Sequence, residues 1–80
     1  MAGLDLETAL QIKLRGNERF KENQFETAID LYSEAIAACP PHRRVELAVI
    51  FQNRAAAHER LDRLQESLRD CDESIKLNNR

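Results

Sequence analysis

The residues best suited to chemistry in this sequence form two rows of basic and carboxamide side chains. Lys13, Asn17 and Lys21 recur every fourth residue, so they share one face if this stretch is helical. A second row of three residues follows at helical spacing: Asn53, Ala56 and Arg60. One ammonium and two carboxamide NH₂ groups can donate together to a carboxylate, which a single surface ion pair would hold only weakly. The predicted chemistry is therefore the binding of an acidic group.

The middle of the first row contains a pair of poor helix formers, Gly16-Asn17. In a helix interior, Gly costs about 1 kcal/mol relative to Ala, and Asn costs about half as much. We interpret Gly16 as a packing residue, because the missing side chain lets a paired helix approach closely. We interpret Asn17 as a donor that acts beside Lys13. Ala56 would keep the surface low enough for a peptide backbone to approach.

Composition limits the class of protein. The 80 residues suffice for one small domain, and the contents of 42% hydrophobic and 32% charged residues are typical of a folded helical protein. The formal net charge of −2 argues against a general nucleic-acid binder. No apolar run approaches the roughly 18 residues that span a membrane, and the N-terminus lacks the pattern of a signal peptide. We therefore expect a cytoplasmic protein without a membrane span, with its two cysteines reduced.

Apolar residues at helical spacing predict four helices, at residues 6–22, 25–38, 43–61 and 64–77. Pro40-Pro41 ends the second of them, because proline interrupts the helical hydrogen bonds. No stretch alternates with the period of a strand. The fold class is therefore all-α, and the short loops predict antiparallel neighbours.

The helices repeat in pairs, with an offset of 39 residues between residues 25–40 and 64–79. The aligned pairs are Phe25 with Leu64, Ala28 with Ser67, Tyr32 with Cys71, Ala35 with Ser74 and Ile36 with Ile75. Such self-similarity predicts stacked helical hairpins, and a helix–turn–helix unit of about 34 residues is the tetratricopeptide repeat. The extra residues lie around positions 41–45, where we expect a longer loop and an extra turn of helix.

The first repeat resembles the tetratricopeptide repeat family at seven positions: Gly16, Phe20, Phe25, Ala28, Tyr32, Ala35 and Pro40. The second repeat departs from the pattern, with Ala55 at the glycine position and Asn79 where a closing proline is usual. The resemblance implies two antiparallel helix–turn–helix hairpins that form a short right-handed α-solenoid. The expected organisation is one domain, 1–80, with repeat one at 6–40 and repeat two at 43–79.

Within that family, KLRGN and FQNRAAA resemble the carboxylate-clamp domains of co-chaperones and mitochondrial import receptors. These domains bind the acidic C-terminal tails of heat-shock chaperones, which typically end Glu-Glu-Val-Asp. The resemblance implies peptide-binding roles for six residues: Lys13, Asn17, Asn53, Ala56, Arg60 and Lys21. The two remaining clamp residues, a Lys and an Arg, belong to the first helix of a third repeat, beyond Arg80. The implied function is that of a co-chaperone adaptor.

An alternative is a scaffold that assembles a complex through other surfaces. The fourth predicted helix carries Leu64, Leu68 and Ile75, which a further helix would normally cover. This alternative predicts self-association through that last helix and no clamp binding.

Metal and enzyme chemistry are the least favoured alternatives. Cys39 and His42 have the spacing of half a zinc site, with His58 and Cys71 as conceivable partners. We interpret Cys71 and His58 as core residues and Arg54 as an ion-pair partner of Asp70. No residue pattern supplies an oxyanion hole or orients a nucleophile. We therefore expect no enzyme activity, no cofactor, no metal and a protein partner.

Overall fold

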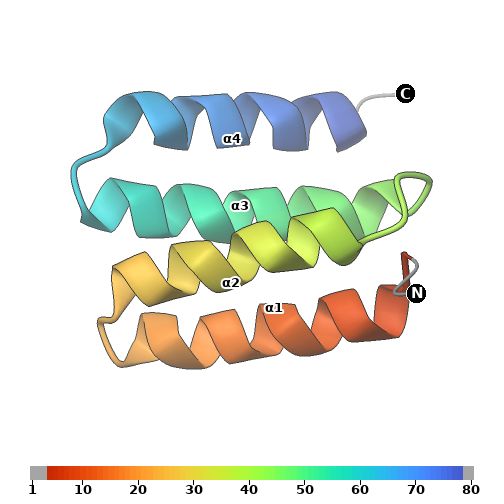
Figure 1. Cartoon of the computed structure of the whole chain (residues 1–80). Coiled ribbons are helices and arrows are strands. Elements are labelled where there is room, and N and C mark those ends of the chain that lie inside the picture. Colours follow the sequence, from red (N-terminus) through yellow and green to blue (C-terminus); the bar gives the residue numbers. More distant parts are fainter. Residues whose placement is uncertain (1–3, 79–80) are drawn as a thin grey trace.

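The computed structural model describes residues 4–78, which form four α-helices (Figure 1). These are α1 (Leu6–Lys21), α2 (Phe25–Ala38), α3 (Arg44–Arg60) and α4 (Leu64–Asn78). The all-α prediction is confirmed, and each predicted helix agrees with the structure to within one residue at either end. Asn79, where the second repeat was expected to end, lies outside the described residues.

The helices pair as two antiparallel hairpins. α1 packs along α2 and α3 packs along α4, while α2 joins the hairpins by packing against α3. Figure 1 shows α1 and α4 at opposite edges of the molecule. α1 and α3 touch at only a few positions, so their side chains meet along a narrow line between the two hairpins. The right-handed sense of the solenoid stays a prediction.

The two hairpin turns repeat each other. Asn23 and Asp62 have φ angles of 61° and 59°, a left-handed conformation that Asn and Asp tolerate better than most residues. In both turns the next residue donates its backbone N–H to the carbonyl five residues earlier, at 2.9 Å. Asn23 and Asp62 are separated by the same 39 residues as the aligned helices, so the predicted repeat extends to the loops.

Side chains close exposed helix ends. At the start of α1, the Asp5 carboxylate accepts a hydrogen bond from the backbone N–H of Glu7 at 3.2 Å. Arg44, in the first turn of α3, donates to the carbonyls of Leu77 (3.1 Å) and Lys76 (2.9 Å) at the end of α4. These last carbonyls have no partner within their own helix, so Arg44 ties the end of α4 to the start of α3.

Small residues let the helices of the first hairpin approach closely around Tyr32. Ala9, Ala28 and Ala35 are fully buried, and Tyr32 is only 1% exposed. A β-carbon built on Gly16 would lie 2.7 and 2.8 Å from two ring carbons of Tyr32. The interpretation of Gly16 as a packing residue is confirmed, and the group that needs the space is the Tyr32 ring.

We predict that Gly16→Ala lowers the free energy of unfolding. Overpacking against the buried ring costs about 1–3 kcal/mol, whereas the better helix propensity of Ala returns about 1 kcal/mol. The expected net loss is up to about 2 kcal/mol, measurable by urea unfolding. Gln11→Ala, on the exposed side of the same helix, is the control and should leave stability unchanged or slightly increased. A Gly16→Ala protein as stable as the native one would contradict this account of the packing.

Candidate functional site

A small hollow lies where α1, α2 and α3 meet. It has a volume of about 130 Å³, and five residues line it: Asn17, Phe20, Tyr32, Asn53 and Ala56. Three of the six residues predicted to bind peptide are therefore neighbours in space, although α1 and α3 are far apart in the sequence. We refer to this place as the α1–α3 hollow.

A chain of hydrogen bonds orders the polar groups of the α1–α3 hollow. The Tyr32 hydroxyl donates to Oδ1 of Asn17 at 2.5 Å, and Nδ2 of Asn53 donates to the same oxygen at 3.2 Å. Within residues 4–78, neither carboxamide has a further side-chain hydrogen bond. The NH₂ group of Asn17 and the second N–H of Asn53 are therefore available as donors to a ligand.

Arg60 is fixed beside the hollow by aromatic rings. Its guanidinium lies 5.2 Å from the ring centroid of Phe20 and 5.5 Å from that of Phe25. The two rings meet edge to face with centroids 5.1 Å apart. A guanidinium over a ring face is attracted by the ring's quadrupole, so Arg60 holds its positive charge next to a residue that lines the hollow.

The two lysines of the first row do not line the hollow. Lys13 is half-buried one turn before Asn17, and it forms no ion pair within the described part of the chain. Lys21 is exposed one turn after Asn17, with its Nζ atom 4.0 Å from a carboxylate oxygen of Glu18. The structure thus places both lysines on either side of Asn17 along α1, and Lys21 already has a partly compensating charge. Peptide binding by all six residues stays a prediction.

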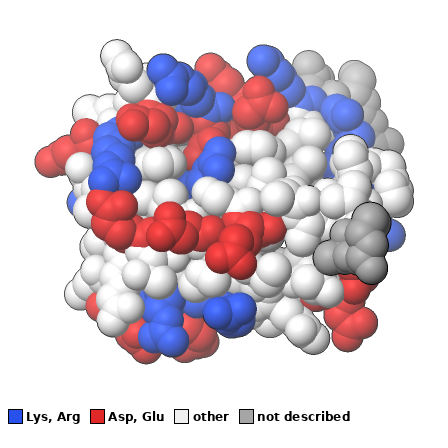
Figure 2. All heavy atoms as spheres, in the orientation of Figure 1, with Lys and Arg blue, Asp and Glu red and all other residues white. Residues whose placement is uncertain are grey.

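Acidic groups gather on a different helix from these donors. Glu26, Asp30 and Glu34 are exposed on α2 at a spacing of four residues. Figure 2 shows a row of acidic side chains across the middle of the molecule, where Figure 1 shows α2. The basic side chains discussed above lie on α1 and α3. These three carboxylates of α2 are thus on a different helix from Lys13, Lys21 and Arg60, and complementarity of charge favours an acidic ligand beside those basic side chains.

Sequence reasoning missed the polar role of Tyr32 and the position of Phe20. In the sequence, both were identified only as residues that match the pattern of the repeat. A signal was present, because Tyr32 is the only tyrosine of the chain and aligns with Cys71, which lacks a hydroxyl. A hydroxyl on a core position next to a glycine predicts a polar partner nearby, since a buried phenol rarely lacks one.

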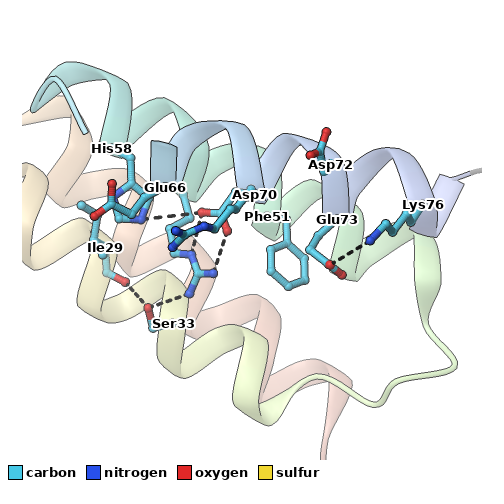
Figure 3. Close-up of a pocket in the computed structure, with 11 residues that line it drawn as sticks. Ile29, Ser33, Phe51, His58, Glu66, Asp70, Asp72, Glu73 and Lys76 are labelled. Atoms are coloured by element: carbon cyan, nitrogen blue, oxygen red, sulfur yellow. Dashed lines mark hydrogen bonds and ion pairs between the residues drawn. The ribbon is translucent and has the colours of Figure 1, made fainter. Parts of the chain in front are cut away.

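A second, larger hollow of about 550 Å³ lies between α2, α3 and α4 (Figure 3). At its floor, Arg54 donates from Nε and from one terminal nitrogen to the two carboxylate oxygens of Asp70, at 2.8 and 2.7 Å. Its other terminal nitrogen donates to the Ser33 hydroxyl at 3.0 Å. The predicted ion pair of Arg54 and Asp70 is confirmed, and one guanidinium joins three helices.

His58 lies against this ion pair and is 8% exposed. Its Nε2 atom is 3.7 Å from a carboxylate oxygen of Asp70, and its Nδ1 atom has no hydrogen-bond partner. Burial lowers the pKa of His58, although the negative charge of Asp70 acts in the opposite direction. Its interpretation as a core residue is confirmed, and the lowered pKa keeps the imidazole neutral at neutral pH.

The structure gives no support to the zinc and nucleophile alternatives. Within residues 4–78, no group of three or more His, Cys, Asp or Glu side chains is arranged to hold a metal ion. Cys39 is buried at the end of α2, where burial raises the pKa of its thiol.

No helix in the described part of the chain is long and apolar enough to cross a membrane.

Parts of several longer proteins are similar in sequence to this chain. The human mitochondrial import receptor subunit TOM70 is 42% identical over 73 residues, which are 91% of this chain and 12% of that protein. Stress-induced-phosphoprotein 1 of Caenorhabditis elegans is 36% identical over 80 residues, covering 100% of this chain and 23% of that protein. Serine/threonine-protein phosphatase T of Aspergillus oryzae is 34% identical over 77 residues, 96% of this chain and 15% of that protein. The chain therefore spans less than a quarter of each of these relatives.

No model of a protein family matches the sequence. The relatives and the two helical hairpins together support a tetratricopeptide repeat domain that resembles those of co-chaperones and import receptors.

We predict that acid lowers the stability of the fold through His58. Because the folded state lowers the pKa of His58, the unfolded chain binds the proton more readily. The contribution is complete above the unfolded pKa of about 6.5, and it is lost as the pH falls toward the lower pKa of the folded state. Melting temperatures measured between pH 7.5 and 5 should fall less steeply in His58→Gln than in the native protein.

His42→Gln is the matched control, because His42 is exposed. This variant should follow the native pH profile. Equal slopes for the native protein and His58→Gln would show that the buried imidazole does not contribute to the pH dependence.

Proposed function

We propose that this chain, which belongs to the tetratricopeptide repeat family, binds the acidic C-terminal tail of a protein partner at the α1–α3 hollow. The proposed partner is a heat-shock chaperone whose tail ends Glu-Glu-Val-Asp. The observation that carries the proposal is the Asn17 carboxamide. Its oxygen is occupied by Tyr32 and Asn53, so its two N–H groups are left to donate to a ligand.

The surroundings of Asn17 support an anionic ligand. The second N–H of Asn53 adds a donor from the neighbouring helix. The small side chain of Ala56 leaves space in the hollow, and Arg60 adds positive charge beside Phe20. Lys13, one turn away, has no carboxylate partner among residues 4–78. Charge-assisted hydrogen bonds from several donors to one carboxylate are stronger than neutral ones and select its geometry.

The relatives support an adaptor function. One of them is named as a receptor subunit for mitochondrial import and another as a stress-induced phosphoprotein. A third is named as a phosphatase, but the chain covers only 15% of it. We propose that this chain is a binding module without catalytic activity, and that it meets its partner in the cytoplasm.

We predict that the chain distinguishes a free C-terminal carboxylate from a C-terminal amide. The probes are two peptides ending Glu-Glu-Val-Asp, one a free acid and the other amidated, titrated by NMR against the labelled chain. Hydrogen bonds to a charged group contribute about 1.5–3 kcal/mol, so the acid should bind at least about tenfold more tightly. Chemical shifts of the Asn17 and Asn53 side-chain amides should change with the acid. The proposal would be wrong if both peptides bound with equal affinity or if neither peptide bound.

Asn17→Asp is the decisive variant of the same titration. It keeps an oxygen for Tyr32 and Asn53 but replaces the NH₂ donor by a negatively charged acceptor. Binding of the acid peptide should be lost. Gln65→Glu, on an exposed position of α4, adds the same charge away from the hollow and should bind like the native chain.

A second candidate function is self-association through α4. Three apolar side chains on this helix are largely exposed: Leu64 at 58%, Leu68 at 64% and Ile75 at 64%. Their spacing sets these apolar residues on one exposed face of the helix, whereas the buried residues of α4, Asp70 and Ser74, are polar. Two copies could cover each other's stripe, since a two-fold interface uses the same patch on both molecules.

We predict that the chain forms dimers at high concentration and that Leu68→Lys returns it to the monomer. The lysine would place a charge at the centre of the dimer interface, where its burial is unfavourable. In the monomer this position is exposed, so the substitution should leave the stability of the monomer unchanged. Sedimentation velocity over a range of concentrations measures this. Leu14→Lys changes a similarly exposed leucine on α1; it is the control and should leave the dimer intact. A native chain that stays monomeric throughout excludes this function.

A further inference from the structure

We propose that the Tyr32 hydroxyl is a positioning group, which fixes the orientation of the Asn17 carboxamide and so lets the α1–α3 hollow reject a carboxamide terminus in favour of a carboxylate. This inference rests on the proposed function. It assigns a specificity role to a buried residue that lines the hollow from α2, a helix that supplies none of the residues predicted to bind peptide.

The hydrogen-bond donors around Asn17 determine the orientation of its carboxamide. A carboxamide can rotate by half a turn and exchange its oxygen with its NH₂ group. In the structure, two donors from two other helices converge on the oxygen of Asn17. The rotated form would bring the NH₂ group of Asn17 against the NH₂ group of Asn53, donor against donor. The shorter of the two bonds, at 2.5 Å, comes from Tyr32.

The side chain of Tyr32 is itself fixed by packing, so it cannot move with Asn17. Its ring is 1% exposed and lies against the backbone of Gly16, where even a β-carbon would be too close. Burial raises the pKa of the phenol, so the hydroxyl keeps its proton at neutral pH and remains a donor. Its oxygen is therefore a fixed point from which the adjacent residue of α1, Asn17, takes its orientation.

The fixed orientation decides which terminus fits. With its oxygen occupied, Asn17 offers only N–H groups to a ligand. A terminal carboxylate presents only acceptors and matches them. A terminal carboxamide has only one oxygen that can accept, so its NH₂ group faces the second donor of the hollow, and a donor that faces a donor in a half-buried hollow loses its hydrogen bonds to water without replacement.

The experiment removes the hydroxyl alone, in Tyr32→Phe, and measures the affinities for the acid and the amide forms of the peptide ending Glu-Glu-Val-Asp. Without the hydroxyl, the Asn17 oxygen keeps only the longer bond from Asn53, so the carboxamide turns more readily and can then accept from a ligand. Affinity for the acid should fall about fivefold to tenfold, the effect of one hydrogen bond, while affinity for the amide is unchanged or increased. The acid-to-amide ratio is the readout, because a merely structural loss would weaken both peptides by the same factor.

Ser33→Ala is the matched control. It removes the hydroxyl of the next residue in α2, which bonds the Ile29 carbonyl and Arg54 in the other hollow. It should lower stability and leave the acid-to-amide ratio at its native value. In an Asn17→Ala background, Tyr32→Phe should no longer change that ratio, because the hydroxyl acts through Asn17.

The outcomes separate the two proposals. A native chain that binds both peptides equally overturns the proposed function and this inference with it. A native chain that prefers the acid, together with a folded Tyr32→Phe variant that keeps the native ratio, overturns this inference alone. Retention of the Tyr32→Phe effect in the Asn17→Ala background would also overturn it, since the hydroxyl would then act by another route. Urea unfolding of each variant establishes that the folded state is compared.

Discussion

The contact between the Tyr32 ring and the backbone of Gly16 is the interaction on which the rest of this structure depends. It allows α1 and α2 to approach so closely that no β-carbon fits between them. The same approach delivers the phenol hydroxyl to the residue that follows the glycine. The same contact explains both of the successive poor helix formers. Gly16 leaves space for the Tyr32 ring, and Asn17 accepts a hydrogen bond from the hydroxyl of that ring.

This coupling makes the polar surface a consequence of the core. Tyr32 is buried, yet its hydroxyl holds Asn17, and Asn17 accepts from Asn53 on the other hairpin. The chain of bonds crosses the line where the two hairpins meet. The orientation of the carboxamides that would bind a ligand therefore depends on how the two hairpins pack against each other. These hydrogen bonds also order the donors before a ligand binds. Such ordering reduces the entropy lost on binding.

The second hairpin solves the same packing problem differently. Ala55 and Cys71 stand where the first has Gly16 and Tyr32, so no hydroxyl reaches the surface there. Its polar interior is instead the ion pair of Arg54 and Asp70, with a neutral His58 beside it. A buried pair of this kind gives little net stability, but it leaves few alternative arrangements for α3 against α4. The repeats share a backbone and differ in where they place polar groups.

Much of the fold could be predicted from the sequence because it depends on local and periodic features. The helix limits follow from apolar spacing and Pro40-Pro41, and the repeat extends even to the left-handed residues Asn23 and Asp62. The hydrogen bonds of Asn17 could not be predicted in this way. They join residues 15 and 36 positions apart and depend on side-chain rotamers within a close contact. The stacking of Arg60 on two rings was missed for the same reason.

The most direct test of the central claim is a crystal structure of the chain with a bound peptide that ends in a free carboxylate. The account predicts that the Tyr32 hydroxyl still donates to Oδ1 of Asn17, and that a terminal carboxylate oxygen lies within hydrogen-bonding distance of both carboxamide nitrogens. A carboxylate bound elsewhere, or an Asn17 oxygen turned away from Tyr32 and toward the ligand, would contradict it.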